Sequence, residues 1–268
     1  MLEEIVKGIE IDHKFEPLIK TENKVLKIDA EGLYYRELNT LLREVIKDKD
    51  IERIEIHNVC GQRYLGTDLA TNIQIDIYGT PGNDLAAFMD GPNIEVHGNA
   101  QDCTGNTMND GHIIVHGRAG DITGYSMRGG KMFIRDDAGY RVGIHMKEYM
   151  GKKPYIVVGG TAQDFLGEYM AGGVLVILGL TLKKGEPYQA RLVGTGMHGG
   201  VIYVRGKIVN LGKEVKVMDV NKTNLKEIEG LVKEYCSYFN ADLKAIMSEK
   251  FVKIVPYSQR PYGRIYAY

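Results

Sequence analysis

The amino-acid sequence predicts an all-β protein, a right-handed parallel β-helix of about seven turns with helical or mixed segments capping both ends. The first supporting observation is a close repeat: residues 94–111 (IEVHGNAQDCTGNTMNDG) correspond to residues 113–130 (IIVHGRAGDITGYSMRGG) at a spacing of 19. A fixed period of about 20 residues is typical of solenoids, whose repeats bury their apolar faces by stacking on one another. The second is that each repeat opens with a β-branched run and lacks a helical pattern, which excludes strand–helix units. The usual chirality of parallel crossovers predicts the right hand.

A glycine followed three residues later by a methionine marks each turn. The pattern occurs seven times, with Ala86 replacing one glycine and Leu69 replacing the first methionine. Because equivalent positions stack, we expect a column of corner glycines with positive φ and an internal column of methionines. Steps of 19, 19, 19, 24 and 27 residues between methionines place insertions near 151–154 and 182–191, which we expect to be surface loops. The two columns are Gly66, Gly105, Gly124, Gly143, Gly167 and Gly194, and Met89, Met108, Met127, Met146, Met170 and Met197.

Residues 1–50 are predicted to form an N-terminal cap. A short helix over 2–7 and strands over 8–15 and 24–30 precede an amphipathic helix over 33–46. In that helix the apolar residues fall at i, i+3, i+4, i+7 and i+8, and we expect Asp29 to be the N-cap. Such a helix suits the open end of a solenoid, where backbone groups lack partners. The apolar residues are Leu38, Leu41, Leu42, Val45 and Ile46.

The solenoid is predicted to occupy residues 51–207, and residues 208–268 to form a C-terminal segment. That segment contains strands around 207–212, 213–220 and 251–256, a helix over 223–239 and a shorter helix over 241–248. We expect the helices to shield the ends of the rod. The tail from Tyr257 to Tyr268 is rich in tyrosine and arginine, residue types enriched where partners bury surface. It either contacts a partner or packs on the chain's own β-helix; its residues of these types are Tyr257, Arg260, Tyr262, Arg264, Tyr266 and Tyr268.

The composition excludes several classes of function. The chain has 34 basic and 35 acidic side chains, a formal charge of −1. It therefore lacks the excess of positive charge that is typical of proteins that bind nucleic acid or anionic membranes. Cys60, Cys103 and Cys236 lie far apart, so they cannot alone hold zinc or an iron–sulfur cluster. No signal peptide and no apolar run of 18 residues occurs, and we expect a cytoplasmic protein.

Two columns of polar residues could bind ions. His97 and His116 occupy the same register on adjacent turns, with His112 near the turn between them, and could provide half of a metal site. We expect no tightly bound metal, because no carboxylate shares their column; a solvated histidine column is the favoured interpretation. Asp102, Asp121 and Asp164 form a second column, with Asn83 beneath. Calcium is the alternative there, but we expect each aspartate to accept backbone N–H bonds at a corner.

Neither the glycine-rich stretches nor the methionines indicate catalysis. The stretches at 159–160 and 194–200 are not followed by a helix N-terminus or by Lys-Ser/Thr, so a phosphate loop is disfavoured. A soft-metal site is the alternative for the methionines, but residues at this spacing are more typically core. We predict no catalytic, cofactor-binding or metal-binding residues in this chain.

The repeat carries a family resemblance. The series G-x-A-x-D-x-x-G-x-x-M-x-x-G, with strands between, resembles the GXGXG β-helix domain that closes the large subunit of glutamate synthase. The segment 56–70 (IHNVCGQRYLGTDLA) is similar to the Asn…Arg…Gly…Leu segment that opens that domain, and residues 251–256 (FVKIVP) to its closing strand. The resemblance covers about residues 25–258.

The resemblance implies a β-helix without an active site of its own. In the long enzyme the domain packs between a glutaminase domain, which has a catalytic N-terminal cysteine, and an FMN and iron–sulfur synthase domain. This chain begins Met1-Leu2-Glu3 and has no cluster cysteines or flavin barrel, so none of those residues can be carried over. We therefore expect a separate scaffold subunit, with a glutaminase subunit and an FMN-binding synthase subunit as partners. FMN and an iron–sulfur cluster are expected in those partners, with no nucleic acid or membrane partner.

Formylmethanofuran dehydrogenase provides the second family resemblance, because one of its subunits shares the repeat and is also a separate chain. The segment containing Asn58, Arg63 and Gly66, together with the FVKIVP ending, favours glutamate synthase. A β-helix enzyme fits less well. A hexapeptide acyltransferase would show a six-residue period, and a polysaccharide lyase would place basic and acidic groups along one groove.

Overall fold

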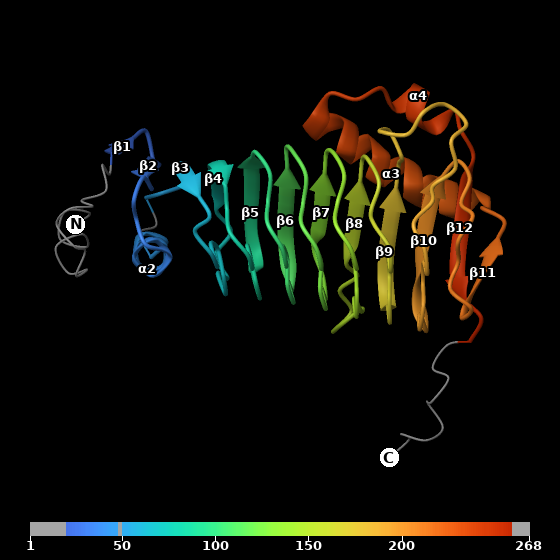
Figure 1. The fold of residues 1–268 in the computed structure, drawn as a ribbon. Coiled ribbons are helices and arrows are strands. Elements are labelled where there is room, and N and C mark those ends of the chain that lie inside the picture. The colour runs from blue at the N-terminus through green and yellow to red at the C-terminus, as the bar shows by residue number, and fades with distance from the viewer. Residues whose placement is uncertain (1–19, 48–49, 259–268) are drawn as a thin grey trace, which may run out of the picture.

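The computed structural model describes residues 20–47 and 50–258, which form a rod built on one twelve-stranded sheet (Figure 1). The strands from β2 to β10 pair in parallel and in chain order. At the ends, β1 pairs antiparallel with β2, and β12 pairs antiparallel with β10 and β11. The strands are β1 (Lys20–Glu22), β2 (Val25–Asp29), β3 (Arg53–Cys60), β4 (Gln74–Thr80), β5 (Asp90–His97), β6 (Asp110–Val115), β7 (Lys131–Ile134), β8 (Tyr155–Val158), β9 (Ala171–Ile177), β10 (Gly199–Arg205), β11 (Val215–Met218) and β12 (Phe251–Pro256).

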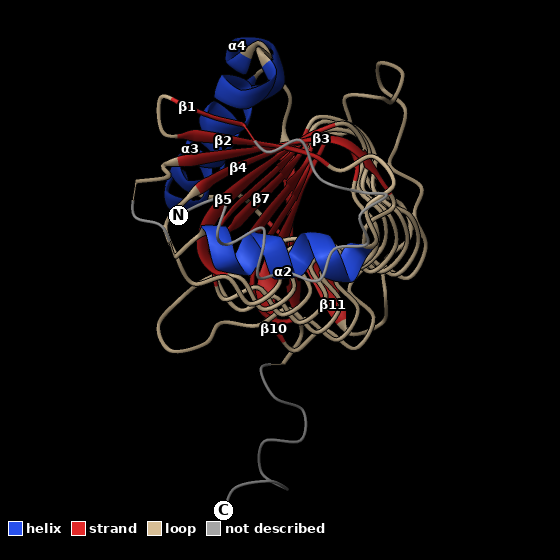
Figure 2. Cartoon of the chain, turned by 90° about the vertical axis from the view of Figure 1, so that its left-hand side faces the viewer, coloured by secondary structure: helices blue, strands red, loops and turns tan. Residues whose placement is uncertain are grey.

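Each turn of the chain contributes one strand to the sheet, while loops form the other sides of the coil (Figure 2). The predicted parallel β-solenoid is therefore confirmed. The seven corner residues from Gly66 to Gly194 enclose about six complete turns, slightly fewer than the seven predicted. Register is kept along the rod: Ile54, Ile75, Ile94 and Ile113 are direct neighbours on successive strands and all point into the interior.

Three alternate residues at each corner have a left-handed backbone. In one turn these are Ile122 (φ 58°), Gly124 (φ 73°) and Ser126 (φ 52°). Only the middle position is regularly glycine, because a Cβ there would point inward; on Gly124 it would overlap the Ile156 side chain. The flanking positions accept other residues at the usual backbone cost of the left-handed region.

The methionines three residues after the corner glycines line the interior. All six of the column are at most 2% exposed, and all six belong to the main apolar core. A flexible thioether fills the space behind a tight corner because it can adapt to the irregular gap there. The interior of each turn is thus built from strand residues on one side and methionine, or Leu69 in the first turn, on the other.

Helix α2 (Tyr35–Val45) covers the N-terminal end of the rod, as the amphipathic pattern predicted (Figure 2). Its buried leucines join the core of the first turns. The prediction that Asp29 is the N-cap is wrong. The N-cap is Tyr34, whose backbone N–H donates to Glu37 Oε2 at 2.9 Å. Asp29 instead accepts hydrogen bonds from the Glu31 N–H and the Asn58 side chain.

Helix α3 (Lys222–Phe239) lies against the outer face of the sheet, over its C-terminal half (Figure 1). The expectation that this helix shields an end of the rod is therefore wrong. The physical reason is that the outward column that contains Glu95 on β5 becomes apolar from Ile114 on β6 onward, so that half of the sheet needs a cover. Helix α4 (Leu243–Met247) follows α3. The second core between α3 and the sheet contains Phe133, Val157, Val174, Val176, Leu178, Tyr203, Ile228, Leu231, Val232, Tyr235, Ile246 and Phe251.

The other predicted C-terminal elements divide into three outcomes. The strand over 251–256 is confirmed as β12, and the run 213–220 contains β11. No strand forms over 207–212, where only isolated bridges join Ile208 to Tyr188 and Leu211 to Val193. The elements predicted within residues 1–19, and the tail from residue 259, lie outside the described residues.

Candidate functional site

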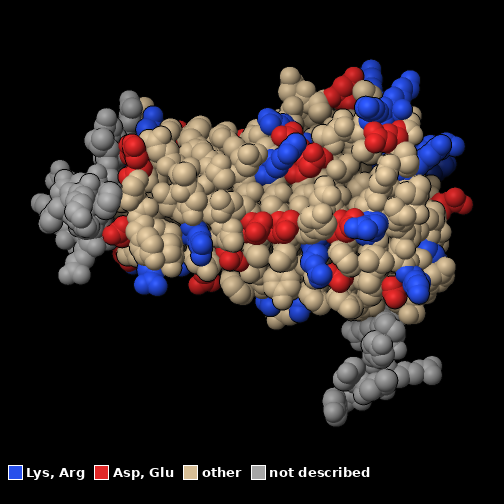
Figure 3. Space-filling model, viewed as in Figure 1, with Lys and Arg blue, Asp and Glu red and all other residues tan. Residues whose placement is uncertain are grey.

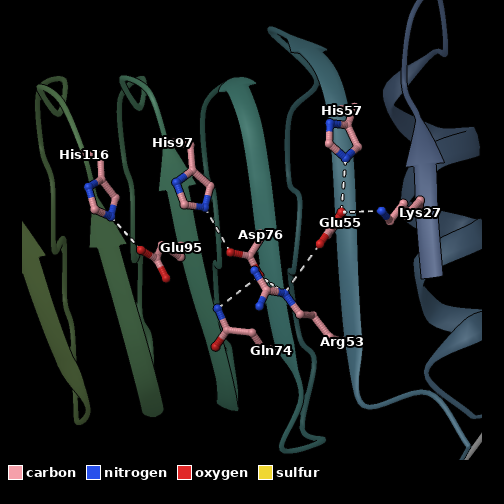
Figure 4. A network of polar contacts seen from close by, with 9 residues as sticks. All are labelled: Lys27, Arg53, Glu55, His57, Gln74, Asp76, Glu95, His97 and His116. Atoms are coloured by element: carbon pink, nitrogen blue, oxygen red, sulfur yellow. Dashed lines mark hydrogen bonds and ion pairs between the residues drawn. The ribbon is translucent and has the colours of Figure 1, made fainter. Parts of the chain in front are cut away.

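The outer face of β3 to β6 is polar and is the candidate site. We call it the outer polar face and define it by the polar, outward-pointing residues of these strands and by His116, which directly follows β6. Because side chains alternate along a strand, residues of equal register form columns across the sheet. Figure 4 shows the histidines of one column reaching toward carboxylates of the next. The outer polar face comprises Arg53, Glu55, His57, Gln74, Asp76, Tyr78, Glu95, His97, His112 and His116.

One column is a stack of rings. The rings of His57 and Tyr78 are 4.5 Å apart between centroids, and those of Tyr78 and His97 are 4.4 Å apart. The rings of His97 and His116 follow at 5.2 Å, nearly parallel. Phe239, at the end of α3, closes the stack edge-on, with 5.1 Å between its ring centroid and that of His116. The predicted stacking of His97 and His116 is confirmed.

Each histidine in the stack is paired with a carboxylate. His97 Nε2 lies 2.9 Å from Asp76 Oδ1, and His116 Nε2 lies 2.6 Å from Glu95 Oε1. In both pairs the carboxylate belongs to the preceding strand, two positions earlier in register (Figure 4). His57 differs, because its partner at 3.4 Å is Glu55 of its own strand.

Asp76 is the buried centre of this network. Its side chain is 1% exposed, and besides His97 it meets the Nε atom of Arg53 at 2.9 Å and the Gln74 amide at 3.3 Å. Burial disfavours the charge on Arg53, but the Asp76 and Glu55 carboxylates outweigh burial and raise the pKa of this guanidinium. The Arg53 guanidinium therefore stays charged, and its contact with Asp76 fixes the position of the carboxylate that His97 also contacts.

Helix α3 forms one wall of the outer polar face. Burial, together with the Glu234 and Glu95 carboxylates, raises the pKa of the Tyr238 hydroxyl. Glu234 in turn binds Lys131 Nζ at 2.6 Å and lies 3.3 Å from His112 Nε2. His112 thus pairs with the helix and not with the other two histidines. The last turn of α3 leaves Glu95 and His116 beside aromatic side chains on one side and solvent on the other.

Glu95, His97 and His116 could together hold a metal ion. One ligand atom from each lies within 4.8 Å of those of the other two, and no other such group occurs among the residues that the structure describes. The sequence reasoning missed Glu95 because it sought a carboxylate in the histidines' own column. The signal was present: an acidic residue stands two positions before the ring residue in IEIH, IDIY and IEVH.

The aspartate column caps corners, as the favoured interpretation predicted. Asp102 Oδ1 accepts the Asp121 N–H at 2.8 Å, and Asp121 Oδ1 accepts the Tyr140 N–H at 2.9 Å. Asp164 Oδ1 accepts the Arg191 N–H at 2.8 Å, and the Arg191 guanidinium adds an ion pair. Each bond joins one turn to the next, so this column stabilises the stacking of corners.

The glycine-rich stretch at 194–200 and the three cysteines, which the sequence also singled out, do not form a site. The stretch 194–200 forms the last corner and leads into β10, a strand rather than a helix. Cys60, Cys103 and Cys236 are free thiols; burial raises the pKa of the Cys103 and Cys236 thiols, which makes them poor nucleophiles.

Exposed aromatic side chains gather at the corners and loops of the coil. The His145 ring stacks on Tyr169 at 5.4 Å and meets the edge of Tyr125 at 6.0 Å. On the face shown in Figure 3, acidic side chains accompany the basic ones, in keeping with the balanced composition. The exposed aromatic residues of this set are Tyr64, Phe88, Tyr125, Tyr140, Tyr149 and Tyr169.

The turns stack on parallel strands, and at each corner three alternate residues have a left-handed backbone. This arrangement corresponds to a β-solenoid of the GXGXG type. The family model of the GXGXG motif matches residues 42–257, so the chain belongs to this family, the type found at the C-terminal end of the glutamate synthase alpha subunit. An uncharacterized protein of Methanocaldococcus jannaschii is 49% identical over 248 residues, covering 89% of this chain and 95% of that protein.

A solved structure shares the fold. It is a chain of the formyltransferase/hydrolase complex from Methylorubrum extorquens, in a crystal structure with methylofuran. The two chains align with a TM-score of 0.60 and 17% identity, covering 85% of this chain and 94% of that one. Among the described residues of the present chain, no helix has the length and apolar character needed to cross a membrane.

Proposed function

We propose that this chain is a non-catalytic scaffold subunit of a glutamate synthase complex, which forms glutamate from glutamine and 2-oxoglutarate. The observation that carries the proposal is the family match from residue 42 to residue 257, which takes in every turn of the solenoid. In this proposal the chain holds a separate glutaminase subunit against a separate FMN-binding synthase subunit in the cytoplasm. Ammonia released by the first then reaches the second without escaping.

The geometry suits such a role. The sheet, the buried methionine column and the aspartate bonds between corners hold each turn of the rod to its neighbours. Repeat proteins use long rigid faces for extended contacts, and tyrosines are enriched where partners bury surface. The exposed aromatic residues at the corners and the outer polar face supply two such faces. FMN and the iron–sulfur cluster belong to the partners, and we expect the purified chain to be colourless.

The segment shared with the glutamate synthase domain has a structural task in this chain. The Asn58 side chain donates to Asp29 at 2.9 Å, and the Arg63 carbonyl accepts a hydrogen bond from the buried Asn39 side chain of α2 at 2.8 Å. These bonds tie the first turn to the N-terminal cap.

Reconstitution tests the proposal. The glutaminase and FMN synthase subunits are assayed with and without this chain, using glutamine or ammonia as the nitrogen donor. We expect glutamine-dependent glutamate synthesis to require the chain, and ammonia-dependent synthesis to require it much less. Unchanged glutamine-dependent turnover in its absence would contradict the scaffold role, as would a visible absorption band from FMN or a cluster in the purified chain.

A second candidate is the β-helix subunit of a formylmethanofuran dehydrogenase-type complex. The shared fold with a chain of the formyltransferase/hydrolase complex favours this alternative. Purification of the chain from its native cells separates the two proposals. Co-elution with a glutaminase and an FMN protein supports glutamate synthase, whereas co-elution with formyl-transferring subunits supports the alternative.

A further inference from the structure

We propose that Glu95, His97 and His116 bind a divalent transition-metal ion of the zinc class on the outer polar face. The sequence-based expectation of no metal rested on the lack of a third ligand in the histidine column. The structure supplies that ligand from the neighbouring column, because the register of β5 and β6 places Glu95 beside His116. This inference does not depend on the proposed scaffold function.

The geometry is close to that of a three-ligand site. The three ligand atoms lie within 4.8 Å of one another. Zinc sits about 2.0–2.2 Å from each nitrogen or oxygen ligand, so small χ rotations of these side chains suffice to place the three atoms around one ion. Two imidazoles and one carboxylate form a ligand set that zinc uses where it keeps an open fourth position. Here that position faces solvent, where water or a group from a partner can occupy it.

The surroundings hold the ligands in place. Asp76, buried and paired with Arg53, contacts His97, and Phe239 packs its edge against the His116 ring. Partners that orient a ligand commonly strengthen metal affinity. The side chains of Glu95, His97 and His116 are only 24–29% exposed, so little side-chain freedom is lost on binding. Without metal, the His116–Glu95 contact is a hydrogen bond, and a bound metal replaces the proton between these two side chains.

The same face contains its own control. His57 also lies in the ring stack and also contacts a carboxylate, Glu55, at 3.4 Å. Its neighbour in the stack is Tyr78 instead of a second imidazole. A metal bound nonspecifically by any histidine–carboxylate pair would use both places, whereas the proposed site uses only the one that contains two histidines.

The test is metal binding by the complete, tag-free chain after treatment with a chelator. Zinc is titrated calorimetrically, and cobalt is titrated as a probe whose visible absorption reports its coordination. We expect about one ion per chain, with affinity at least about 10-fold lower in Glu95→Gln and His116→Ala. His57→Ala should match the unmodified chain. Circular dichroism checks that each variant is folded. If His116→Ala does not fold, the zinc affinity of the near-isosteric Glu95→Gln tests the proposal.

Three results would overturn the proposal. The first is that the unmodified chain takes up no zinc or cobalt after chelator treatment. The second is that Glu95→Gln, when folded, binds as tightly as the unmodified chain. The third is that His57→Ala loses as much affinity as His116→Ala, which would indicate scattered binding on surface histidines. Each readout concerns the isolated chain, so failure here leaves the reconstitution test of the scaffold role unaffected.

Discussion

The Tyr235 hydroxyl donates a hydrogen bond to the Arg135 carbonyl at 2.9 Å, joining α3 to the end of β7 across 100 residues of sequence. The Tyr235 side chain is only 2% exposed and lies directly over Gly159 of the next turn, where a Cβ would collide with its hydroxyl. The bond and this close approach therefore fix where α3 lies along the sheet and which side of the helix faces it.

Substitution of Tyr235 should separate this bond from the packing of its ring. Tyr235→Phe removes only the hydroxyl and should lower the free energy of unfolding by about 1 kcal/mol. Tyr235→Ala also removes a buried ring and should cost about 3–5 kcal/mol. Urea unfolding measures both. The exposed Tyr257 serves as control, since Tyr257→Phe should be silent. Equal effects of the two Tyr235 substitutions would show that the ring contributes nothing.

Buried tyrosines should make the protein sensitive to alkaline pH. Burial raises the pKa of Tyr188, Tyr203 and Tyr235 above the ordinary value of 10.0. Above about pH 10 the unfolded chain loses these protons while the folded chain keeps them, so stability is complete below that pH and falls as pH rises. For the deeply buried Tyr188 the slope should reach about 1.4 kcal/mol per pH unit. Urea midpoints between pH 8 and pH 11 test this.

The matched variant for the alkaline effect is Tyr188→Phe. Tyr188 donates its hydroxyl to the Ala162 carbonyl, so this variant should lose some stability at pH 8. It should also lose stability less steeply with rising pH, because one titrating group is gone. A pH slope identical to that of the unmodified chain would mean that Tyr188 does not resist ionisation in the fold.

The methionine column should behave as core. Met127→Ala should cost about 2–5 kcal/mol, because turns on both sides pack against the buried thioether. Met127→Leu keeps most of the volume and should cost under about 1.5 kcal/mol. Met150, 83% exposed, provides the control, and Met150→Ala should leave the melting temperature unchanged. Thermal melts that show no loss in Met127→Ala would contradict the internal position.

The corner glycines combine a backbone requirement with a steric one, and two glycines separate the contributions. Gly124 and Gly151 have φ of 73° and 78°, but only at Gly124 would a Cβ meet a neighbour, the Ile156 side chain. Gly151→Ala should therefore cost only the left-handed backbone energy, about 1–2 kcal/mol. Gly124→Ala should cost clearly more, because Ile156 must also move. Similar losses of stability in both variants would show that the Ile156 side chain can move aside at no cost.

Most of the fold could be predicted from the sequence because the repeat is strict. A 19-residue period fixes the stacking, and the Gly-to-Met spacing fixes which residues turn a corner and which fill the core. In the first turn Leu69 replaces methionine, yet Gly66 still forms the corner and Leu69 still fills the core, so the pattern tolerates this substitution. The position of α3 was not predicted, although a signal exists. The outward column changes from Glu95 on β5 to Ile114 on β6 and Phe133 on β7, and that change indicates a covered half of the sheet.

The outer polar face was predicted only in part. The register of His97 and His116 followed from the repeat, since equal positions stack. Their carboxylate partners could not be obtained by comparing equal positions, because each histidine reaches diagonally to the preceding strand. The contact with Phe239 depends on where a helix more than 100 residues later in the chain docks, which no local pattern specifies.

The aspartate column gives the last prediction, which separates corner capping from ion binding. Asp121 Oδ1 accepts the Tyr140 N–H, while the Asp121 N–H donates to Asp102. Asp121→Ala removes a charged acceptor and should lower the free energy of unfolding by about 1–2 kcal/mol. Asp121→Asn keeps an oxygen at the same position and should cost less than half as much. If the column bound calcium instead, both variants would abolish a calcium-induced rise in melting temperature. We expect no such rise in the unmodified chain, and thermal melts with calcium or with a chelator measure it directly.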